Sequence, residues 1–514
     1  MCGILLHYNP NIVHEDRFLE FNEDECISVD ESNGTSEIFN AIIPHIANRG
    51  PNYSSLRLSE KYHTAWFSSV LALRLPFTKQ SLCVEDRYVL QFNGELYNKE
   101  IKQDQNDTQF IASLLSSSTD VIHTLTQLDG EFAYTIYDLR ETKIYFGRDS
   151  IGKRSLCFKM DTTNGLYVAS CTGNIEGFEN CLGGVIYIFD LNERTISEHS
   201  KIIQRQYEVV DLIDENMETL DSMKEKLYTV LNESVSKRVT SIHPLHIESS
   251  PISVLFSGGL DCSVLVALIC EQLRIFNPNT TVELLTVGFE NPRIGMLPKD
   301  VPDRKLAISS SEVLKGLYPD IDIKLVYIDI PYEEYLKYRP TVINLMYPKQ
   351  TEMDLSIAIA FFFASRGSGF IVDDVTRDEI PYQRKGIVLF SGLGADELYG
   401  GYHKFVNRSL EELSAELTGQ INNIHDRNLN RDDKVIASNG VEVRYPFLDH
   451  NVVQFSTQEI PINYKVNKLI LRKVASDILH LGGISTEPKR AIQFGSKSAK
   501  MTKDGNKHGT DLLK

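Results

Sequence analysis

Apolar runs rich in β-branched and aromatic residues recur between residues 65 and 187, and Gly, Asn, Asp and Pro separate them. Runs of this length and composition are typical of strands, and only one helix-like stretch, residues 108–115, interrupts the series. This part of the chain therefore predicts antiparallel sheets with few helices. The predicted strands are residues 70–75, 88–92, 131–138, 143–147, 166–170 and 184–190.

The hydrophobic pattern changes after Asp190, where polar and charged residues continue to about residue 215 and an amphipathic helical pattern follows at 220–235. Further on, apolar strands alternate with helices, an order that predicts a parallel sheet with crossover helices. We therefore predict an α/β multi-domain protein with domains at residues 2–190 and 216–514 and a linker at 191–215. The alternating segments are 252–256, 262–273, 282–288, 326–328, 354–365 and 387–390, with surface loops at 291–304 and 373–385.

Composition narrows the classes of function. The 514 residues are 42% hydrophobic and 24% charged, the balance of a soluble globular protein. A net charge of −17 disfavours nucleic-acid binding as the main role, because it repels phosphate backbones. The densest apolar run, residues 357–364, is far shorter than the roughly 20 residues that cross a bilayer. The eight cysteines show no metal-ligand spacing. We expect free thiols, a cytoplasmic location, and no membrane or nucleic-acid partner.

Cys2 is the first candidate catalytic residue. Once Met1 is removed, Cys2 carries a thiol and a free α-amine, and the amine can act as the base that activates the thiol. A cysteine at this position is weak support by itself, but a series of motifs follows it. They are Asn48-Arg49-Gly50-Pro51, Phe92-Asn93-Gly94-Glu95-Leu96-Tyr97-Asn98, Asp107-Thr108, Leu128-Asp129-Gly130-Glu131-Phe132-Ala133 and Gly147-Arg148-Asp149.

In order and spacing this series resembles the class II glutamine amidotransferases, whose N-terminal nucleophile (Ntn) domain has an αββα fold. The resemblance implies that Cys2 attacks the glutamine amide while the Asn93 side chain and the Gly94 NH stabilise the oxyanion. It also implies that Arg49, a planar cation, binds the α-carboxylate and that Asp107, together with Glu95, binds the α-ammonium. The simpler alternatives are a hairpin turn at Asn93-Gly94 and solvated surface charges at Arg49 and Asp107.

A candidate phosphate loop, Ser257-Gly258-Gly259-Leu260-Asp261-Cys262-Ser263, joins the predicted strand 252–256 to a helix. Exposed backbone NH groups and a helix N-terminus suit a pyrophosphate, so Ser257, Gly258, Gly259 and Ser263 could cradle it. Asp261 could then hold Mg²⁺. A glycine turn with an N-cap aspartate is the simpler alternative. Residues 147–154 fit a Walker A loop only up to Arg154, so we do not expect a nucleotide there.

The phosphate loop resembles that of the N-type ATP pyrophosphatases, which have an adenine nucleotide alpha hydrolase-like fold. A second acidic motif, residues 390–402, and the segments 439–449 and 468–473 extend the resemblance to the glutamine-hydrolysing asparagine synthetase family. The resemblance implies ATP and Mg²⁺ as cofactors, and aspartate, glutamine and ATP as substrates of an asparagine-forming ligase. It assigns Asp261 and Asp396 to Mg²⁺, the backbone of Leu255, Val287 and Gly392 to adenine, and Lys489 and Arg490 to phosphate.

Two departures from that family leave the acceptor open. Leu393 replaces a family glutamate thought to act in amide formation, and leucine cannot relay a proton. Residues 345–353 lack the arginine expected to bind the aspartate carboxylate. With these departures, the sequence resembles the asparagine synthetase domain-containing proteins, a subgroup of the family. The alternatives are therefore amidation of another carboxylate and a non-catalytic regulatory relative. The sequence is compatible with a homo-oligomer and does not indicate one.

Overall fold

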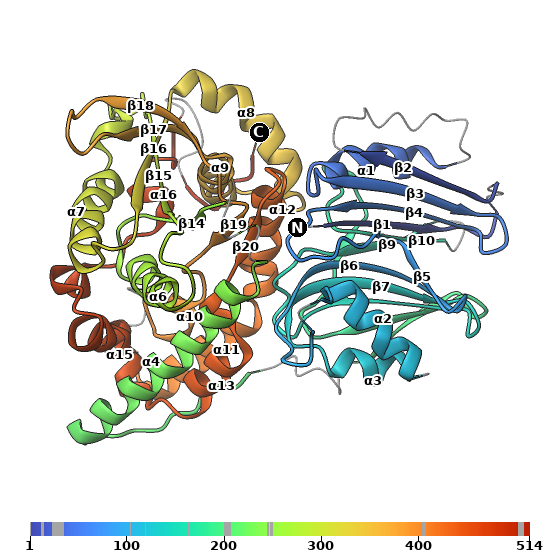
Figure 1. Ribbon diagram of the computed structural model, residues 1–514, viewed down its shortest axis with the longest axis horizontal. Coiled ribbons are helices and arrows are strands. Elements are labelled where there is room, and N and C mark those ends of the chain that lie inside the picture. The colour runs from blue at the N-terminus through green and yellow to red at the C-terminus, as the bar shows by residue number, and fades with distance from the viewer. Residues whose placement is uncertain are drawn as a thin grey trace. The chain divides into compact units, whose positions relative to one another are not determined.

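A computed structural model describes residues 2–11, 15–22, 35–102, 104–118, 120–161, 165–199, 207–243, 246, 250–402, 408–501 and 508–513. The chain forms two compact units (Figure 1). The first unit contains residues 1–205 together with 344–348 and 425–441, and the second contains the rest. The hydrophobic pattern did not indicate that these two distant segments belong to the first unit.

The first unit contains two antiparallel sheets. Five of the predicted strands are confirmed and overlap β6, β7, β8, β10 and β12. The first sheet has the order β11 (Glu179–Asn180), β9 (Cys157–Met160), β10 (Leu166–Ala169), β1 (Gly3–Tyr8), β4 (Thr64–Val70), β3 (Tyr53–Ser59), β2 (Arg17–Asn22). The second has the order β13 (Thr195–His199), β12 (Ile186–Asp190), β8 (Lys143–Arg148), β7 (Gly130–Asp138), β6 (Tyr88–Leu96), β5 (Leu82–Val84).

Three helices of the first unit begin at side-chain caps. Ser36 caps α1 (Glu37–Ala47), and Asp120 caps α3 (Val121–Thr126). The helix predicted at 108–115 is confirmed as α2 (Asp107–Ser117), which a capping box between Asn106 and Gln109 starts. This capping box fixes Asp107 as the first residue of the helix. A distant segment contributes η4 (His425–Leu429) and α12 (Asn430–Ala437).

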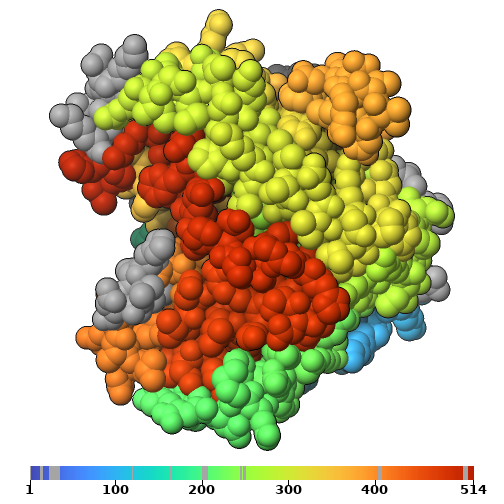
Figure 2. All heavy atoms as spheres, turned by 90° about the vertical axis from the view of Figure 1, so that its left-hand side faces the viewer, coloured from blue at the N-terminus to red at the C-terminus, as the bar shows by residue number. Residues whose placement is uncertain are grey.

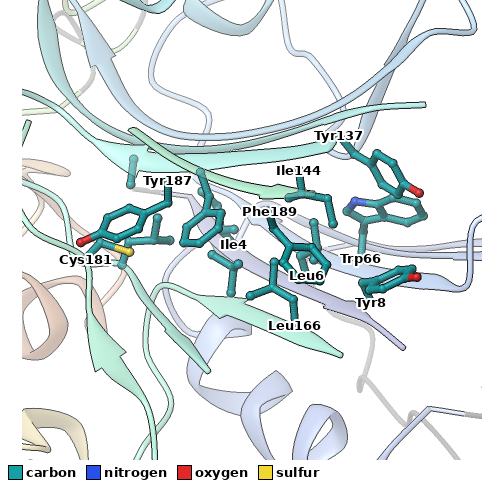
Figure 3. Close-up of a cluster of buried hydrophobic side chains, with 14 of the residues drawn as sticks. Ile4, Leu6, Tyr8, Trp66, Tyr137, Ile144, Leu166, Cys181, Tyr187 and Phe189 are labelled. Carbon is teal, nitrogen blue, oxygen red and sulfur yellow. The ribbon is translucent and has the colours of Figure 1, made fainter. Parts of the chain in front are cut away.

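Three apolar clusters define four layers. One cluster fills the space between the two sheets and contains Trp66, Tyr137 and Phe189 (Figure 3). A second joins α1 to the first sheet, and a third joins α2 and α3 to the second sheet. Strands β4 and β7 are buried along their whole length because both faces of each sheet are covered. The first unit therefore has the predicted αββα architecture.

The second unit is built on one sheet, and its parallel core is confirmed. Strands β14, β15, β16, β19 and β20 pair with one another in parallel, whereas β17 pairs antiparallel with both β16 and β18 at one edge. The order is β18 (Glu379–Gln383), β17 (Ser368–Val372), β16 (Ile323–Ile330), β15 (Val282–Phe289), β14 (Ile252–Leu255), β19 (Val388–Phe390), β20 (Glu442–Arg444).

Helices cover this sheet and extend beyond it, and within the described residues none has the length and apolarity that a bilayer crossing requires. The longer helices are α4 (Met217–Thr240), α6 (Leu260–Phe276), α7 (Pro302–Leu317), α8 (Tyr332–Met346), α9 (Glu352–Arg366), α11 (Leu410–Asn422) and α13 (His450–Gln458). The short ones are α10 (Ala395–Leu398), α14 (Ile462–Lys465), α15 (Leu469–Lys473), α16 (Ile492–Gly495), η2 (Pro298–Asp300), η5 (Pro446–Leu448), η6 (Val466–Lys468), η7 (Val474–Ile478) and η8 (Gly482–Thr486).

The strand order reverses between β14 and β19. From β14 the chain adds β15 and then β16 on one side, and it later returns to add β19 and then β20 on the other. In open α/β sheets, ligands bind in the crevice outside the carboxyl ends of the strands at such a switch point. The loops that follow β14 and β19 are therefore the expected place for a ligand, and the helices that they lead into, α6 and α10, carry the two predicted Mg²⁺ ligands, Asp261 and Asp396, in their first turns.

Some predicted elements were wrong. Only Val70 of the predicted strand 70–75 lies in β4, since the chain then leaves the sheet. The predicted loop 373–385 contains β18, and the predicted loop 291–304 contains η2 and the start of α7. The first two errors have a local cause, because alternating apolar residues can be buried without strand pairing and polar residues can form an exposed edge strand.

Candidate functional site

Asn93 and Gly94 lie inside β6, so the hairpin-turn alternative is wrong. Asn93 is fully buried, and within the described residues neither of its side-chain polar atoms has a hydrogen-bond partner. Gly94 has a φ of +147°, and a Cβ there would overlap the Glu131 carbonyl oxygen. A buried amide without a partner is costly unless a ligand completes it. Asn93 is therefore suited to donate to a bound oxyanion.

Cys2 lies just before β1 and is partly exposed. The Gln91 amide of β6 donates to the carbonyl oxygens of Leu5 and Phe67, at 3.2 and 3.0 Å. Further along β6, Glu95 contacts Arg74, which follows the Val70 end of β4. Asn93 lies between Gln91 and Glu95 on β6, that is, between the position that contacts Leu5 and the position beside the end of β4. Gly3 of β1 pairs with Ser69 near that end of β4, so Asn93 and Cys2 lie at the same end of the two sheets.

Arg74 brings the two predicted glutamine-binding carboxylates together. Its guanidinium forms an ion pair with Glu95 and contacts Asp107 Oδ1 at 3.0 Å. Asp107 also accepts a hydrogen bond from the Leu96 NH at 2.9 Å. A zwitterionic amino acid needs a cation for its α-carboxylate and a carboxylate for its α-ammonium, and Arg74, Glu95 and Asp107 supply both kinds of group. Sequence reasoning missed Arg74 because this arginine sits within an apolar run that predicted a strand.

Arg49 has a different partner. Its side chain is only 1% exposed, so the surface-charge alternative is wrong for this residue. Nη2 contacts Asp433 Oδ2 at 2.8 Å, and Nε donates to the Cys2 carbonyl oxygen at 3.3 Å. The structure therefore places Arg49 at the nucleophile's backbone and at a buried carboxylate. Arg49 was predicted to bind the α-carboxylate of glutamine, and Arg74 is a second arginine that could bind the same group.

The loop at residues 147–154 is already filled by a carboxylate of the chain. Asp149 accepts hydrogen bonds from the NH groups of Ile151 and Gly152, both at 3.0 Å, and from that of Lys153 at 2.9 Å. Backbone NH groups arranged in this way bind anions, and here the anion is Asp149 itself. This geometry agrees with the rejection of the loop as a nucleotide site.

The predicted phosphate loop connects β14 to α6. Gly258 has a φ of +79°, and a Cβ there would lie 2.5 Å from the Leu306 carbonyl carbon. Its carbonyl oxygen accepts hydrogen bonds from Ser310 Oγ at 2.7 Å and from Ser263 Oγ at 3.4 Å. No side chain caps α6 at Gly259. Ser310 and Ser263 therefore hold the loop through the Gly258 carbonyl oxygen, while the first NH groups of α6 lack a side-chain cap. Uncapped NH groups at a helix N-terminus suit a phosphate.

Replacing Gly258 with alanine is expected to destabilise the second unit by about 2–3 kcal/mol, because alanine is strained at this φ and contacts the α7 backbone. Binding of ATP should weaken as well. Gly316, in α7 with no atom within 4 Å of an added Cβ, provides the control. Melting temperature and calorimetric ATP titration check both variants, and equal behaviour of G258A and G316A would contradict the assigned loop geometry.

The two predicted metal ligands meet at one lysine. Lys468 Nζ contacts Asp261 Oδ2 and Asp396 Oδ1, both at 2.6 Å, and Lys489 pairs with the other Asp396 oxygen. Burial opposes ionisation of Asp396, but the charges of Lys468 and Lys489 outweigh it and lower the pKa of this carboxyl. Burial likewise opposes the charge on Lys489, but Asp396 and Asp261 raise the pKa of its ammonium. Both groups are therefore charged at neutral pH.

From the sequence, Lys468 belongs only to a segment, residues 468–473, that resembles the asparagine synthetase family, and no role was predicted for it. Its backbone φ is +60° and that of Asn467 is +51°, so two consecutive residues adopt the left-handed conformation that directs the lysine to the aspartates. The sequence gives only a weak signal for this turn, because neither residue is a glycine and only Asn467 is of a type that favours the left-handed region. Arg490, the other predicted phosphate ligand, contacts Asp303 at 3.8 Å. Burial raises the pKa of Asp303 to about 7, although Arg490 opposes the shift.

The predicted adenine-binding residues also come together. Leu255 ends β14, Val287 lies near the end of β15, and Gly392 follows β19, so they mark the carboxyl ends of three adjacent strands. A Cβ on Gly392 would lie 3.1 Å from Asp261 Cβ. Figure 2 shows C-terminal residues, in red, beside the yellow-green residues near 300, and the Phe289 NH donates to Ser496 O at 3.0 Å. The segment with Lys489 and Arg490 therefore lies against the strand ends.

Asp261 and Asp396 fit a Mg²⁺ ion. Both carboxylates converge on a single cationic nitrogen, so they share one cation position, and carboxylate oxygens are the donors that Mg²⁺ prefers. Across the described part of the chain, His, Cys, Asp and Glu side chains form no group of three or more that could hold a metal. Mg²⁺ in nucleotide enzymes is commonly bound by one or two carboxylates together with substrate phosphates.

Known proteins match both halves of the chain. A glutamine amidotransferase domain family matches residues 71–176, and the asparagine synthase family matches residues 407–514. An asparagine synthetase domain-containing protein of Saccharomyces cerevisiae is 62% identical over 521 residues, covering 100% of this chain and 99% of that protein. Asparagine synthetase domain-containing protein 1 of Mus musculus is 27% identical, covering 99% and 98%.

A putative glutamine-hydrolysing asparagine synthetase of Methanocaldococcus jannaschii is 28% identical, and the match covers 80% of this chain and 78% of that protein. The two domain families follow the predicted order, with the amidotransferase domain first. The relative from Saccharomyces cerevisiae extends this similarity over the whole chain. The chain belongs to the asparagine synthetase domain-containing proteins.

Proposed function

We propose that this protein is a glutamine-dependent amidotransferase that hydrolyses glutamine at Cys2 and uses ATP to activate a carboxylate in its second unit. The observation that carries the proposal is the convergence of Asp261, Asp396, Lys468 and Lys489 at the switch point of the parallel sheet. The domain families support glutamine-dependent amidation in general. The family supports ATP as a substrate.

The proposed glutaminase step begins when the Cys2 thiolate attacks the side-chain carbonyl carbon of glutamine. The α-amine of Cys2 takes the thiol proton and passes it to the leaving nitrogen, so that ammonia departs and a thioester remains. Asn93 Nδ2 and the Gly94 NH would stabilise the oxyanion in both tetrahedral intermediates. Water then releases glutamate and restores the thiol. The unpartnered amide of Asn93 supports this assignment.

We assign the α-carboxylate of glutamine to Arg74 rather than to Arg49. Arg74 already contacts Glu95 and Asp107, which would receive the α-ammonium, whereas Arg49 contacts Asp433 and Cys2. Arg74→Gln should therefore raise the KM for glutamine about 10- to 100-fold, the loss of one charge-assisted contact, and lower kcat less. Steady-state glutaminase assays measure both parameters.

Arg87→Gln is the matched control for Arg74→Gln. Arg87 is 12% exposed and Arg74 is 14% exposed, and Arg87 Nη2 pairs with Asp138 at 2.7 Å in the same unit. Its replacement should lower stability and leave the KM unchanged. A normal KM in R74Q, with a raised KM in an Arg49 variant, would return the carboxylate-binding role to Arg49.

In the second unit, an acceptor carboxylate would attack the α-phosphate of ATP, forming an acyl-adenylate and releasing pyrophosphate. Ammonia would then attack the acyl carbon and release AMP. Lys468 and Lys489 would neutralise charge on the departing pyrophosphate, and the phosphate loop would orient it. Mg²⁺, bound by Asp261 and Asp396, would supply further charge neutralisation at the phosphate oxygens.

Aspartate is the proposed acceptor, which would make the protein an asparagine-forming ligase of asparagine biosynthesis. Two sequence departures, Leu393 and the missing arginine at 345–353, favour a second candidate, the amidation of another carboxylate. An ATP–pyrophosphate exchange screen against a panel of acids decides between them. Exchange with aspartate alone supports asparagine formation, exchange with another acid alone supports the second candidate, and exchange with none would favour a non-catalytic relative.

The cytoplasmic location is also a proposal. It rests on the cysteines, because the seven that the structure describes form no disulfide, and Cys26 lies outside the described residues. Cysteines that form no disulfide are typical of proteins in a reducing compartment. Fluorescence microscopy of the tagged chain tests this proposal, provided that the tag is at the C-terminus and leaves Cys2 processing intact.

A further inference from the structure

The interior of the first unit contains a buried network of charged side chains. Asp433 Oδ2 accepts hydrogen bonds from Arg49 Nη2 at 2.8 Å, from the Ser155 NH at 2.9 Å and from Ser155 Oγ at 2.6 Å. Its other oxygen lies 3.9 Å from Arg154, and Arg154 lies 3.3 Å from Glu131. The side chains of Arg49, Arg154, Glu131 and Asp433 are all 0–1% exposed.

Asp433 comes from a segment that is far from the rest of this network in sequence. It lies in α12, and Figure 1 shows α12 beside the N-terminal end of the chain. Burial opposes ionisation of Asp433, but the charges of Arg49 and Arg154 outweigh it and lower the pKa of this carboxyl. Two buried guanidinium groups require such a counter-charge, because an uncompensated charge in a protein interior is strongly unfavourable. Asp433 therefore holds both arginines in place.

Arg49 connects this network to the candidate nucleophile. Its Nε donates to the Cys2 carbonyl oxygen at 3.3 Å while its Nη2 is fixed by Asp433. A planar guanidinium held at one edge has a defined direction at the other, so the position of Asp433 determines where the hydrogen bond to Cys2 points. The next residue restricts Cys2 further, since a Cβ on Gly3 would lie 2.5 Å from Ile46 Cγ2.

We infer that Asp433 is a positioning residue for the glutaminase reaction, which acts by holding Arg49 against the backbone of Cys2. The inference rests on the proposed function. It assigns to residues 425–441 a part in glutamine hydrolysis, although they follow the second unit's α11 in sequence. It also separates two tasks among the arginines of the first unit, since Arg74 binds the substrate and Arg49 orients the nucleophile.

A double-mutant cycle on the full-length chain tests the inference. D433N and R49Q should each lower the kcat of glutamine hydrolysis up to about 100-fold, the cost expected when a reacting group is misplaced by about 1 Å. The KM for glutamine should change less than about twofold in both, because the substrate contacts are untouched. R49Q/D433N should be no slower than the slower single variant, since both changes remove one interaction.

Asp426→Asn is the control, because Asp426 lies in the same segment and accepts a hydrogen bond from Asn180 at 3.3 Å, and Asn180 is not one of the network residues named above. D426N should keep the wild-type kcat. Multiplicative losses in the double variant, or a raised KM with an unchanged kcat in R49Q, would overturn the inference. If D433N does not fold, the double variant R49Q/D433N, in which both charges are removed, is compared with D426N. A wild-type kcat in the double variant would also overturn the inference.

Alkylation of Cys2 by iodoacetamide, followed by mass spectrometry of the N-terminal peptide, gives a readout that does not need glutaminase activity. The rate should fall several-fold in D433N and R49Q and stay at the wild-type value in D426N. If the wild-type chain hydrolyses no glutamine, the proposed function fails while the alkylation rates still test the positioning role. Equal rates in all variants would overturn the inference even in an active enzyme.

Discussion

Replacing Cys2 with alanine is expected to abolish glutamine hydrolysis, with a loss in kcat of about 10⁴-fold or more, because the change removes the thiol that attacks the amide carbon. ATP–pyrophosphate exchange and product formation from added ammonia should continue, since they use residues of the second unit. A coupled glutamate assay and the exchange assay, applied to the same preparation, measure the two activities separately.

Cys83→Ala is the control for Cys2→Ala. Cys83 is an exposed cysteine of the same unit, in the edge strand β5, and its replacement should leave both activities unchanged. Equal loss of both activities in C2A would contradict the assignment of the two reactions to separate sites. A fully active C2A would exclude Cys2 as the nucleophile.

The second large effect is expected at the paired aspartates. Asp261→Asn or Asp396→Asn should lower ATP–pyrophosphate exchange by about 10²- to 10³-fold, because each change removes several kcal/mol of charge stabilisation around the departing pyrophosphate. Each change also leaves Lys468 with one carboxylate instead of two. Glutamine hydrolysis in the first unit should persist. Exchange kinetics at saturating ATP, together with the Mg²⁺ dependence of the rate, measure the effect.

Asp320→Asn is the matched control, because Asp320 pairs with Arg274 on the surface of the second unit, where the two side chains are 47% and 38% exposed. This variant should exchange at the wild-type rate, since exposed ion pairs contribute little. Loss of exchange in D320N as large as in D261N would indicate general instability instead of a site effect. Undiminished exchange in both D261N and D396N would contradict the proposed ATP site.

Sequence patterns predicted the architecture because hydrophobic periodicity reflects local structure. The short runs of the first half became strands of two stacked sheets, and the alternation after residue 251 became β14, α6 and β15. The motifs also predicted which side chains approach the carboxyl ends of β14 and β19, since the ends of parallel neighbours lie at one edge. The sequence therefore predicted that Asp261 and Asp396 lie close together, and both contact Lys468.

The remaining features depend on contacts between residues far apart in sequence. Arg74 lies in an apolar run that resembles a strand, and only the fold shows that the chain leaves β4 and brings its guanidinium to Glu95 and Asp107. Asp433 lies 384 positions after Arg49, and no local pattern indicates that α12 joins the first unit. Lys468 depends on a left-handed turn formed without glycine.

Isotope transfer from glutamine tests the central claim most directly. The purified chain is incubated with glutamine carrying ¹⁵N in the side-chain amide, ATP, Mg²⁺ and aspartate or another acid, and products are measured by mass spectrometry. The account predicts an acceptor amide carrying ¹⁵N, with glutamate, AMP and pyrophosphate formed in equal amounts. Formation of ADP and phosphate, or neither glutamate nor pyrophosphate with any acid, would contradict it.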